Sequence, residues 1–136
     1  MQKQIFRREL INLTIIFTEN DELNEELEKN IEGSRIAYYT KYLLEEKDAD
    51  IVILTIQDNK FEFEKFLYEL RKRNIRVILL LENEKQKETE IAIRLGIYDL
   101  VFGTFALSDV LKLVKNANNF SNIAEIYRKK YKVEVE

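Results

Sequence analysis

The stretch Asp48-Ala49-Asp50-Ile51-Val52-Ile53-Leu54-Thr55 holds the strongest fold signal in this sequence. Its apolar run at 51–54 lacks the alternation of polar and apolar residues that marks a half-exposed strand. Strands without that alternation are covered by helices on both faces of a parallel sheet. We therefore expect residues 51–54 to form a central strand. Residues 75–81, which contain the apolar run 77–81, are expected to form another.

Outside these two runs, apolar β-branched segments alternate with segments of helical periodicity, which is the pattern of βαβ units. The expected strands are residues 13–17, 35–39, 51–54, 75–81 and 99–102. The expected helices are one opened by Asn20 and stopped by Gly33, then 41–47, 61–73, 84–95 with Gly96 as its stop, and 107–114 with Ser108 as its N-cap.

The composition of the chain changes after Val114. Asn116, Asn118 and Asn119 are expected to end the helix, and Ser121 to cap a further one with Ile123 on its apolar side. We expect one domain over residues 1–115 and a C-terminal helix or tail over 116–136. That tail is either a docked helix or a connector to a domain outside this sequence.

Composition excludes several classes of function. The 136 residues suit one domain, and the net charge of −3 with a pI near 5.3 argues against a nucleic-acid partner. The chain has no Cys and no His, so disulfides, thiolate ligands and imidazole bases are absent. Neither a signal peptide nor a membrane-spanning run is evident, and we expect a soluble cytoplasmic protein without membrane contact.

The residues carry a resemblance to a known family over about 11–115. The segments 18–23, 48–55 and Leu95-Gly96-Ile97-Tyr98-Asp99 resemble landmarks of the receiver domain of two-component response regulators. This resemblance implies a CheY-like, flavodoxin-like α/β fold. It is a doubly wound three-layer α/β/α sandwich whose five-stranded parallel sheet has the order 2-1-3-4-5 and whose site lies at the carboxyl ends of the strands.

The same resemblance shows which functional positions differ here. Thr55 stands where receivers carry the phosphoacceptor aspartate, and Thr18 and Glu19 stand where they carry an acidic pair for Mg²⁺. Leu81 replaces the hydroxyl residue after strand 4, and Gly103 the lysine after strand 5. The resemblance thus implies a degenerate receiver, with no phosphoryl transfer, no enzymatic activity, and no resident cofactor or metal.

Two classes of function follow from this interpretation. The first is a phosphorylation-independent regulatory module that binds a protein partner, similar to the N-terminal receiver-like domain of some ParA/MinD-type ATPases in pilus-assembly or mobile-element systems. The second is a small-ligand-binding protein or weak Mg²⁺-dependent enzyme, in which Glu19 and Asp58 lie at the carboxyl edge of the sheet. The favoured interpretation of those two carboxylates is that they solvate loops and cap helices.

The resemblance also places a candidate interaction face at the fifth strand. Tyr98, Phe102 and Phe105 would form its aromatic centre, and mixed charges on residues 84–94 its rim, which suits a homodimer. The alternative is that Phe102 and Phe105 fill the core.

Two further groups of side chains have ordinary structural interpretations. We expect Tyr38, Tyr39 and Tyr42 to pack, as part of an aromatic edge strand, on a neighbouring helix; the alternative is that they stack on a base or ring of a ligand. Arg71, Arg76 and neighbouring cations are expected to form a solvated face near the end of the 61–73 helix.

Overall fold

The computed structural model describes residues 12–56 and 62–134. Its sheet has five strands: β1 (Thr14–Phe17), β2 (Ser34–Ile36), β3 (Ile51–Thr55), β4 (Arg76–Leu81) and β5 (Asp99–Phe102). All neighbouring pairs are parallel, and the strand order is β2-β1-β3-β4-β5. The predicted fold class and strand order are confirmed.

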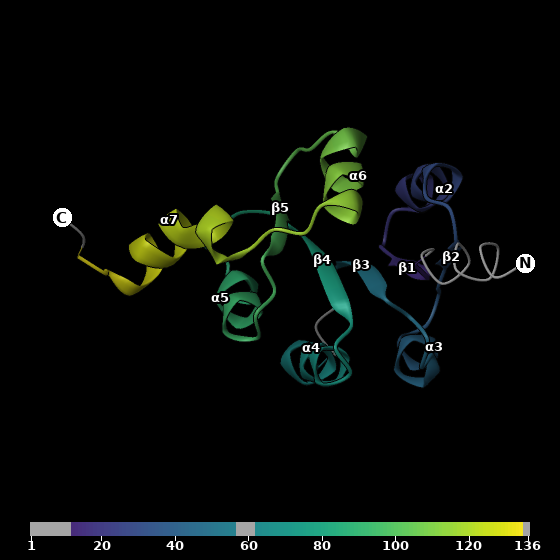
Figure 1. Cartoon of the computed structure of the whole chain (residues 1–136), viewed down its shortest axis with the longest axis horizontal. Helices are drawn as coiled ribbons and strands as arrows, with labels where there is room; N and C mark the ends of the chain where they lie inside the picture. The colour runs from purple at the N-terminus through teal and green to yellow at the C-terminus, as the bar shows by residue number, and fades with distance from the viewer. Residues whose placement is uncertain (1–11, 57–61, 135–136) are drawn as a thin grey trace, which may run out of the picture.

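Helices cover both faces of the sheet, as Figure 1 shows. The helices are α2 (Asp21–Asn30), α3 (Thr40–Glu45), α4 (Phe63–Lys72), α5 (Lys87–Arg94), α6 (Leu107–Lys115) and α7 (Phe120–Tyr131). On one face lie α2 and α6, and on the other lie α3, α4 and α5. No helix among residues 12–56 and 62–134 has the length and apolar character needed to span a membrane.

The two faces of the sheet bury separate hydrophobic clusters, because side chains alternate along each strand. Val52 and Leu54 point toward α3, α4 and α5, whereas Ile51 and Ile53 point toward α2 and α6. Residues 51–54 are all at most 2% exposed, which agrees with a strand buried on both sides.

The edge strand β2 is shorter than predicted. It ends at Ile36, and Tyr38 and Tyr39, expected inside the strand, follow it with 68% and 74% of their surfaces exposed. The prediction that these two rings pack in an edge strand is wrong. Only Ala37 continues the pairing, through its amide hydrogen bond to the Ile16 carbonyl.

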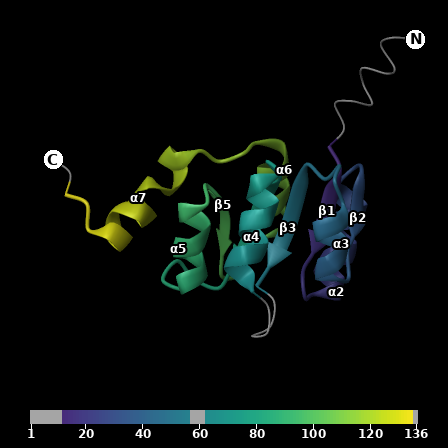
Figure 2. The same ribbon diagram turned by 90° about the horizontal axis from the view of Figure 1, so that it is seen from below.

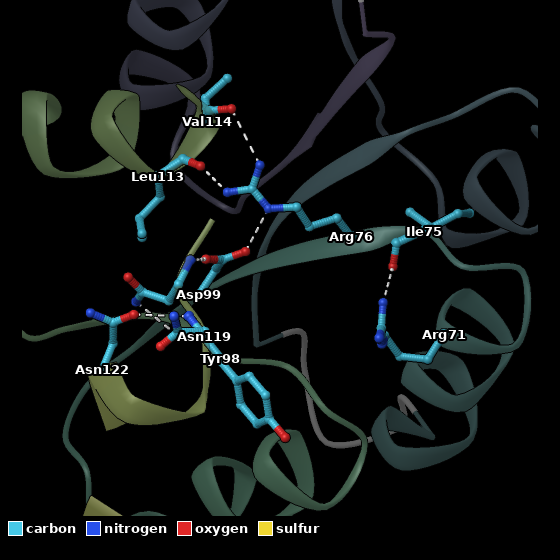
Figure 3. Close-up of polar contacts among 10 residues, drawn as sticks. Arg71, Ile75, Arg76, Tyr98, Asp99, Leu113, Val114, Asn119 and Asn122 are labelled. Carbon is cyan, nitrogen blue, oxygen red and sulfur yellow. Dashed lines mark hydrogen bonds and ion pairs between the residues drawn. The ribbon is translucent and has the colours of Figure 1, made fainter. Parts of the chain in front are cut away.

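Two predicted helix caps are also wrong. The first residue of α6 is Leu107, and the Asp109 carboxylate accepts the Ala106 amide hydrogen bond at 2.9 Å, so Ser108 lies within the first turn. Helix α7 begins at Phe120, and Asn122 accepts the Asn119 amide hydrogen bond at 2.8 Å in place of a cap by Ser121 (Figure 3). By contrast, the predicted Asn20 cap of α2 is present, at 3.0 Å from the Leu23 nitrogen.

Helix α7 packs beside α5 and the β5 edge of the sheet, as both ribbon views show (Figures 1 and 2). Ile123 is 3% exposed and belongs to the core cluster under α5. The Phe120 ring meets the Tyr98 ring edge-on at 5.9 Å, and Lys129 lies 3.9 Å from the Glu84 carboxylate. The tail after residue 116 therefore adds a docked helix to the domain.

The predicted solvated face of cations is wrong for two of its members. Arg71 donates a hydrogen bond to the carbonyl oxygen of Ile75 at 3.0 Å (Figure 3). It also donates to the Leu95 carbonyl at 3.1 Å, and so joins α4 to the end of α5. Arg76 forms an ion pair with Asp99. Both residues are half-buried and serve tertiary contacts, because their acceptors lie on neighbouring elements.

Candidate functional site

A cavity of about 620 Å³ lies at the carboxyl edge of the sheet. It is formed where β1, β3, β4 and β5 end, which is the place at which open α/β sheets put their ligand sites. Its lining residues are Glu19, Asn20, Thr55, Ile56, Leu80, Leu81, Glu82, Gln86, Gly103, Thr104 and Phe105. Four of the five degenerate receiver positions are thus brought together here, and Thr18 is the exception.

Thr55 ends the central strand β3 and lies at the middle of this edge. Its hydroxyl oxygen accepts a hydrogen bond from the Glu19 amide at 3.1 Å, which ties the loop after β1 to β3. A neutral hydroxyl becomes nucleophilic only when a base lies beside it. No Lys or His is among the described residues that line the cavity.

Thr18 turns away from the cavity into the start of α2. Its hydroxyl and amide both contact the Asn24 Oδ1 atom, the amide at 3.3 Å, and the Asn24 amide group donates to the Thr18 carbonyl at 3.3 Å. Both residues are buried. The Thr18 side chain therefore holds the β1–α2 loop in place and is not a ligand of the cavity.

Asn24 is a structural residue that sequence reasoning missed. It lies three residues before Leu27, on the apolar face of α2, and is 3% exposed. A buried polar side chain needs hydrogen-bond partners. The position of this asparagine on the apolar face of α2 is the sequence feature that could have predicted its structural role.

The loops after β4 and β5 complete the wall of the cavity. The Gln86 side chain accepts hydrogen bonds from the amides of Glu82 (2.8 Å) and Asn83 (3.3 Å). Gly103 donates its amide to the Leu81 carbonyl at 2.8 Å and has φ of +64°, a conformation that favours glycine. Leu81, 4% exposed, presents an apolar surface where receivers have a hydroxyl.

The charge of the cavity is negative. Glu19 and Glu82 are the charged members of its lining, and both are exposed. No group of three His, Cys, Asp or Glu side chains within reach of one metal ion occurs in the described part of the chain. Asp58 lies outside the described residues, so the structure does not test the expected Glu19–Asp58 pair. The two carboxylates among the described lining residues disfavour a phosphate-bearing ligand.

The predicted interaction face is divided by the sheet. Phe102 and Tyr98 pack against the cluster under α5, whereas Phe105 packs against the cluster under α6. All three side chains are half-buried. Because Phe120 of α7 lies against Tyr98, the face at residue 98 is already in contact with this chain's own C-terminal helix.

Comparisons with known proteins identify the fold. No protein-family model matches the chain, and no curated protein matches it either. Among solved structures it is similar to a LuxR-family DNA-binding response regulator from Staphylococcus aureus. The TM-score is 0.61 and the identity 18%, over 79% of this chain and 99% of that one.

Two further structures give the same result. A CheY-like receiver domain protein from Methanospirillum hungatei matches with a TM-score of 0.62 and 13% identity, over 87% of this chain and 98% of that one. The chemotaxis protein CheY4 of Vibrio cholerae matches with 0.63 and 10%, over 79% and 99%. At these identities the likeness shows a CheY-like receiver fold, and the neighbours are regulators.

Proposed function

We propose that this chain is a degenerate receiver domain that acts through protein contacts, in the cytoplasm, without phosphoryl transfer and without enzymatic activity. The observation that carries the proposal is Thr55, which ends the central strand at the centre of the carboxyl-edge cavity. Receivers place a nucleophilic aspartate at that position. Here the hydroxyl instead accepts the Glu19 amide hydrogen bond.

The remaining wall of the cavity supports the same proposal. The Mg²⁺ pair is reduced to Glu19, since Thr18 is engaged by Asn24, and a hard divalent cation needs several oxygen ligands. Leu81 and Gly103 supply neither the hydroxyl nor the ammonium group that receivers use to respond to the phosphoryl group. A domain of this kind would keep its interaction surface in one conformation, and protein partners would bind that conformation directly.

The test is phosphorylation by a small donor. We expect no mass change when the protein is incubated with acetyl phosphate and Mg²⁺, while a receiver that carries the aspartate gains about 80 Da, one phosphoryl group, in the same buffer. A stoichiometric gain of that mass in this chain would contradict the proposal.

A second candidate function rests on the cavity itself. Its volume of about 620 Å³ is in the range of small-molecule sites, so a small-ligand-binding protein or weak Mg²⁺-dependent enzyme is the alternative. A thermal-shift screen with Mg²⁺, FMN and nucleotides separates the two functions, because a ligand that binds only the folded state raises the unfolding temperature. Stabilisation by any of these would favour the ligand-binding function.

We also propose that the domain belongs to a larger regulatory or ATPase protein. The similarity of residues 95–99 and of the segment after Phe120 to the receiver-like domain of ParA/MinD-type ATPases supports this. The gene sequence beyond Glu136 tests it: an adjoining ATPase domain is expected, and a stop codon directly after Glu136 would contradict it.

A further inference from the structure

The two ends of the sheet differ in how the chain covers them. At the start of β5, Asn118 donates hydrogen bonds to the Asp99 carboxylate at 2.6 Å and to the Tyr98 carbonyl at 3.0 Å. The strand β2 forms the other end of the sheet, away from α7 (Figure 1). No described residue pairs with its outer side. An unpaired strand edge can accept an extended peptide as an additional strand.

The hydrogen bonds of β2 show which of its backbone groups point outward. The Gly33 carbonyl accepts a bond from β1 at 3.2 Å, and the Ala37 amide donates one to β1 at 2.8 Å. Successive residues of a strand direct their polar backbone groups to opposite sides. The amide and carbonyl groups of Ser34 and Ile36 therefore point away from β1. Both residues are half-buried, and no other described residue forms a hydrogen bond with these outward groups.

Helix α2 lies beside this edge on one face of the sheet. Ile36 packs against the cluster under α2, and the Ser34 hydroxyl donates to the Glu28 carbonyl at 3.4 Å. Asn30 marks the side of α2 that faces α6, because both line one cavity. At about 3.6 residues per turn, Asp21 and Glu28 lie on the opposite side of the helix from Asn30. They are therefore on the side of β2.

This side of the edge is acidic. Its exposed carboxylates, none of which forms an ion pair with a described residue, are those of Asp21, Glu25 and Glu28. The one lysine of α2, Lys29, lies 3.9 Å from Glu26. On the other face of the edge, Arg35 lies 4.0 Å from the Glu46 carboxylate, which offsets its charge. The net charge beside β2 favours a cationic partner and repels an anionic one.

Two exposed aromatic rings follow the same strand. Tyr38 and Tyr39 come directly after the β2 pairing and are 68% and 74% exposed. Tyrosine is enriched at protein interfaces, and a lysine or arginine placed over its ring is attracted to the ring face. A second copy of this chain fits this edge poorly, because a two-fold contact through β2 would bring the acidic sides of two α2 helices together.

We propose that the β2 edge binds an extended basic segment of a partner protein, which adds to the sheet as a further strand. Its backbone would bond the outward groups of Ser34 and Ile36. Side chains alternate along a strand, so every second residue of the segment would face α2, where lysine or arginine would meet Asp21 and Glu28. This inference rests on the proposed function, a domain that acts through protein contacts, and adds the chemistry of the partner.

The test titrates the isotope-labelled full chain with a capped hexapeptide in which lysine and valine alternate, and follows the backbone amides by NMR. We expect saturable shifts at Ser34, Ile36 and Tyr38, with a dissociation constant on the order of 1 mM or tighter. Hydrogen exchange of the Ser34 and Ile36 amides should slow at saturation, because both would donate to the peptide.

Two control peptides separate strand addition from simple charge attraction. A fully N-methylated version keeps the charge and loses the backbone donors, and a glutamate-valine version reverses the charge. Each should bind roughly tenfold more weakly or worse. The proposal is overturned if the lysine peptide leaves the β2 signals unmoved, or if either control binds as tightly. It is also overturned if dilution of the free protein shifts the same signals, since a second copy would then occupy the edge.

Paired variants test the acidic side of α2. Asp21→Asn with Glu28→Gln should weaken binding of the lysine peptide by roughly fivefold, because exposed charge pairs each contribute little. Glu22→Gln with Glu26→Gln is the matched control. It removes the same charge from the side of the exposed helix surface nearer Asn30, and should leave the affinity within roughly twofold. Equal weakening by the two pairs would overturn the assignment of the edge.

Failure of this inference can be told apart from failure of the proposed function. If the peptide does not bind and acetyl phosphate leaves the mass unchanged, only the assignment of the β2 edge is wrong. A mass gain of one phosphoryl group contradicts the proposed function, whatever the peptide does.

Discussion

The Nε atom of Arg76 lies 2.6 Å from the Oδ2 atom of Asp99, and this ion pair joins the first residues of β4 and β5. The same guanidinium donates to the carbonyls of Leu113 and Val114 at the end of α6 (Figure 3). The other Asp99 oxygen accepts the Asn118 amide at 2.6 Å. One buried pair therefore connects the sheet, α6 and the segment that leads to α7.

Removal of this carboxylate should destabilise the domain strongly. Asp99→Ala leaves the mostly buried Arg76 without its counter-charge, and we expect the free energy of unfolding to fall by about 3 kcal/mol. Urea denaturation measures it. Glu62→Ala is the control, since the Glu62–Lys65 pair is 76% exposed on both sides and should cost less than about 1 kcal/mol. Equal losses in the two variants would show that the Arg76–Asp99 pair has no special structural role.

Loss of the Asn24 side chain should also be costly. Asn24→Ala removes the acceptor of the buried Thr18 amide, so the free energy of unfolding should drop by about 1–3 kcal/mol. Asn30→Ala provides the comparison, because Asn30 is exposed and donates only to the Glu26 carbonyl within its own helix. If the two substitutions have the same small effect in chemical denaturation, the Thr18–Asn24 contact does not hold the loop.

Restoring an aspartate at the end of β3 should not restore phosphoryl transfer. In Thr55→Asp the second metal carboxylate and the lysine after β5 are still missing, and Glu19 and Glu82 make the site more negative. Intact mass after incubation with acetyl phosphate and Mg²⁺ should stay that of the unmodified variant. A phosphorylated fraction would mean that Thr55 alone separates this chain from an active receiver.

Self-association through the β5 region remains a prediction. Light scattering should give a dimer at micromolar concentration. Phe105→Glu should give a folded monomer, because the substitution replaces a half-buried aromatic ring after β5 with a charge that an apolar contact disfavours. Tyr68→Glu, at a 52% exposed tyrosine of α4, is the control and should stay dimeric. A monomeric unmodified chain, or a dimeric Phe105→Glu protein, would eliminate this interface.

The ion pair on α7 predicts a pH dependence. The hydrogen bond from Arg128, together with its charge, holds the pKa of Glu125 below its ordinary value. Stability from this pair is therefore complete above the ordinary pKa of a glutamate and is lost as the pH falls through the lowered one. An NMR titration should show the pKa of Glu125 return toward its ordinary value in Arg128→Ala. Lys129→Ala should change it less, and equal changes would contradict this cause.

The sequence by itself determined the alternating α/β class of this protein, and its resemblance to receiver domains implied the strand order. The apolar runs at 51–54 and 77–81 and the helical periodicity between them are local signals, because burial on one or both faces of a strand determines the polarity of consecutive residues. The absence of an aspartate at position 55 could likewise be read directly, and so could the Asn20 cap.

Only the tertiary structure decided which polar side chains meet. Arg76 and Asp99 are 23 residues apart, and Arg76 and Leu113 are 37 apart, so no local pattern distinguishes Arg76 from a solvated cation. Three other features also depend on tertiary contacts. Phe120 packs on Tyr98, Thr18 bonds Asn24 and does not line the carboxyl-edge cavity, and the buried Thr14 hydroxyl has no hydrogen-bond partner among the described residues. Each of these contacts depends on which elements the completed fold brings side by side. Periodicity along the chain does not predict which elements become neighbours.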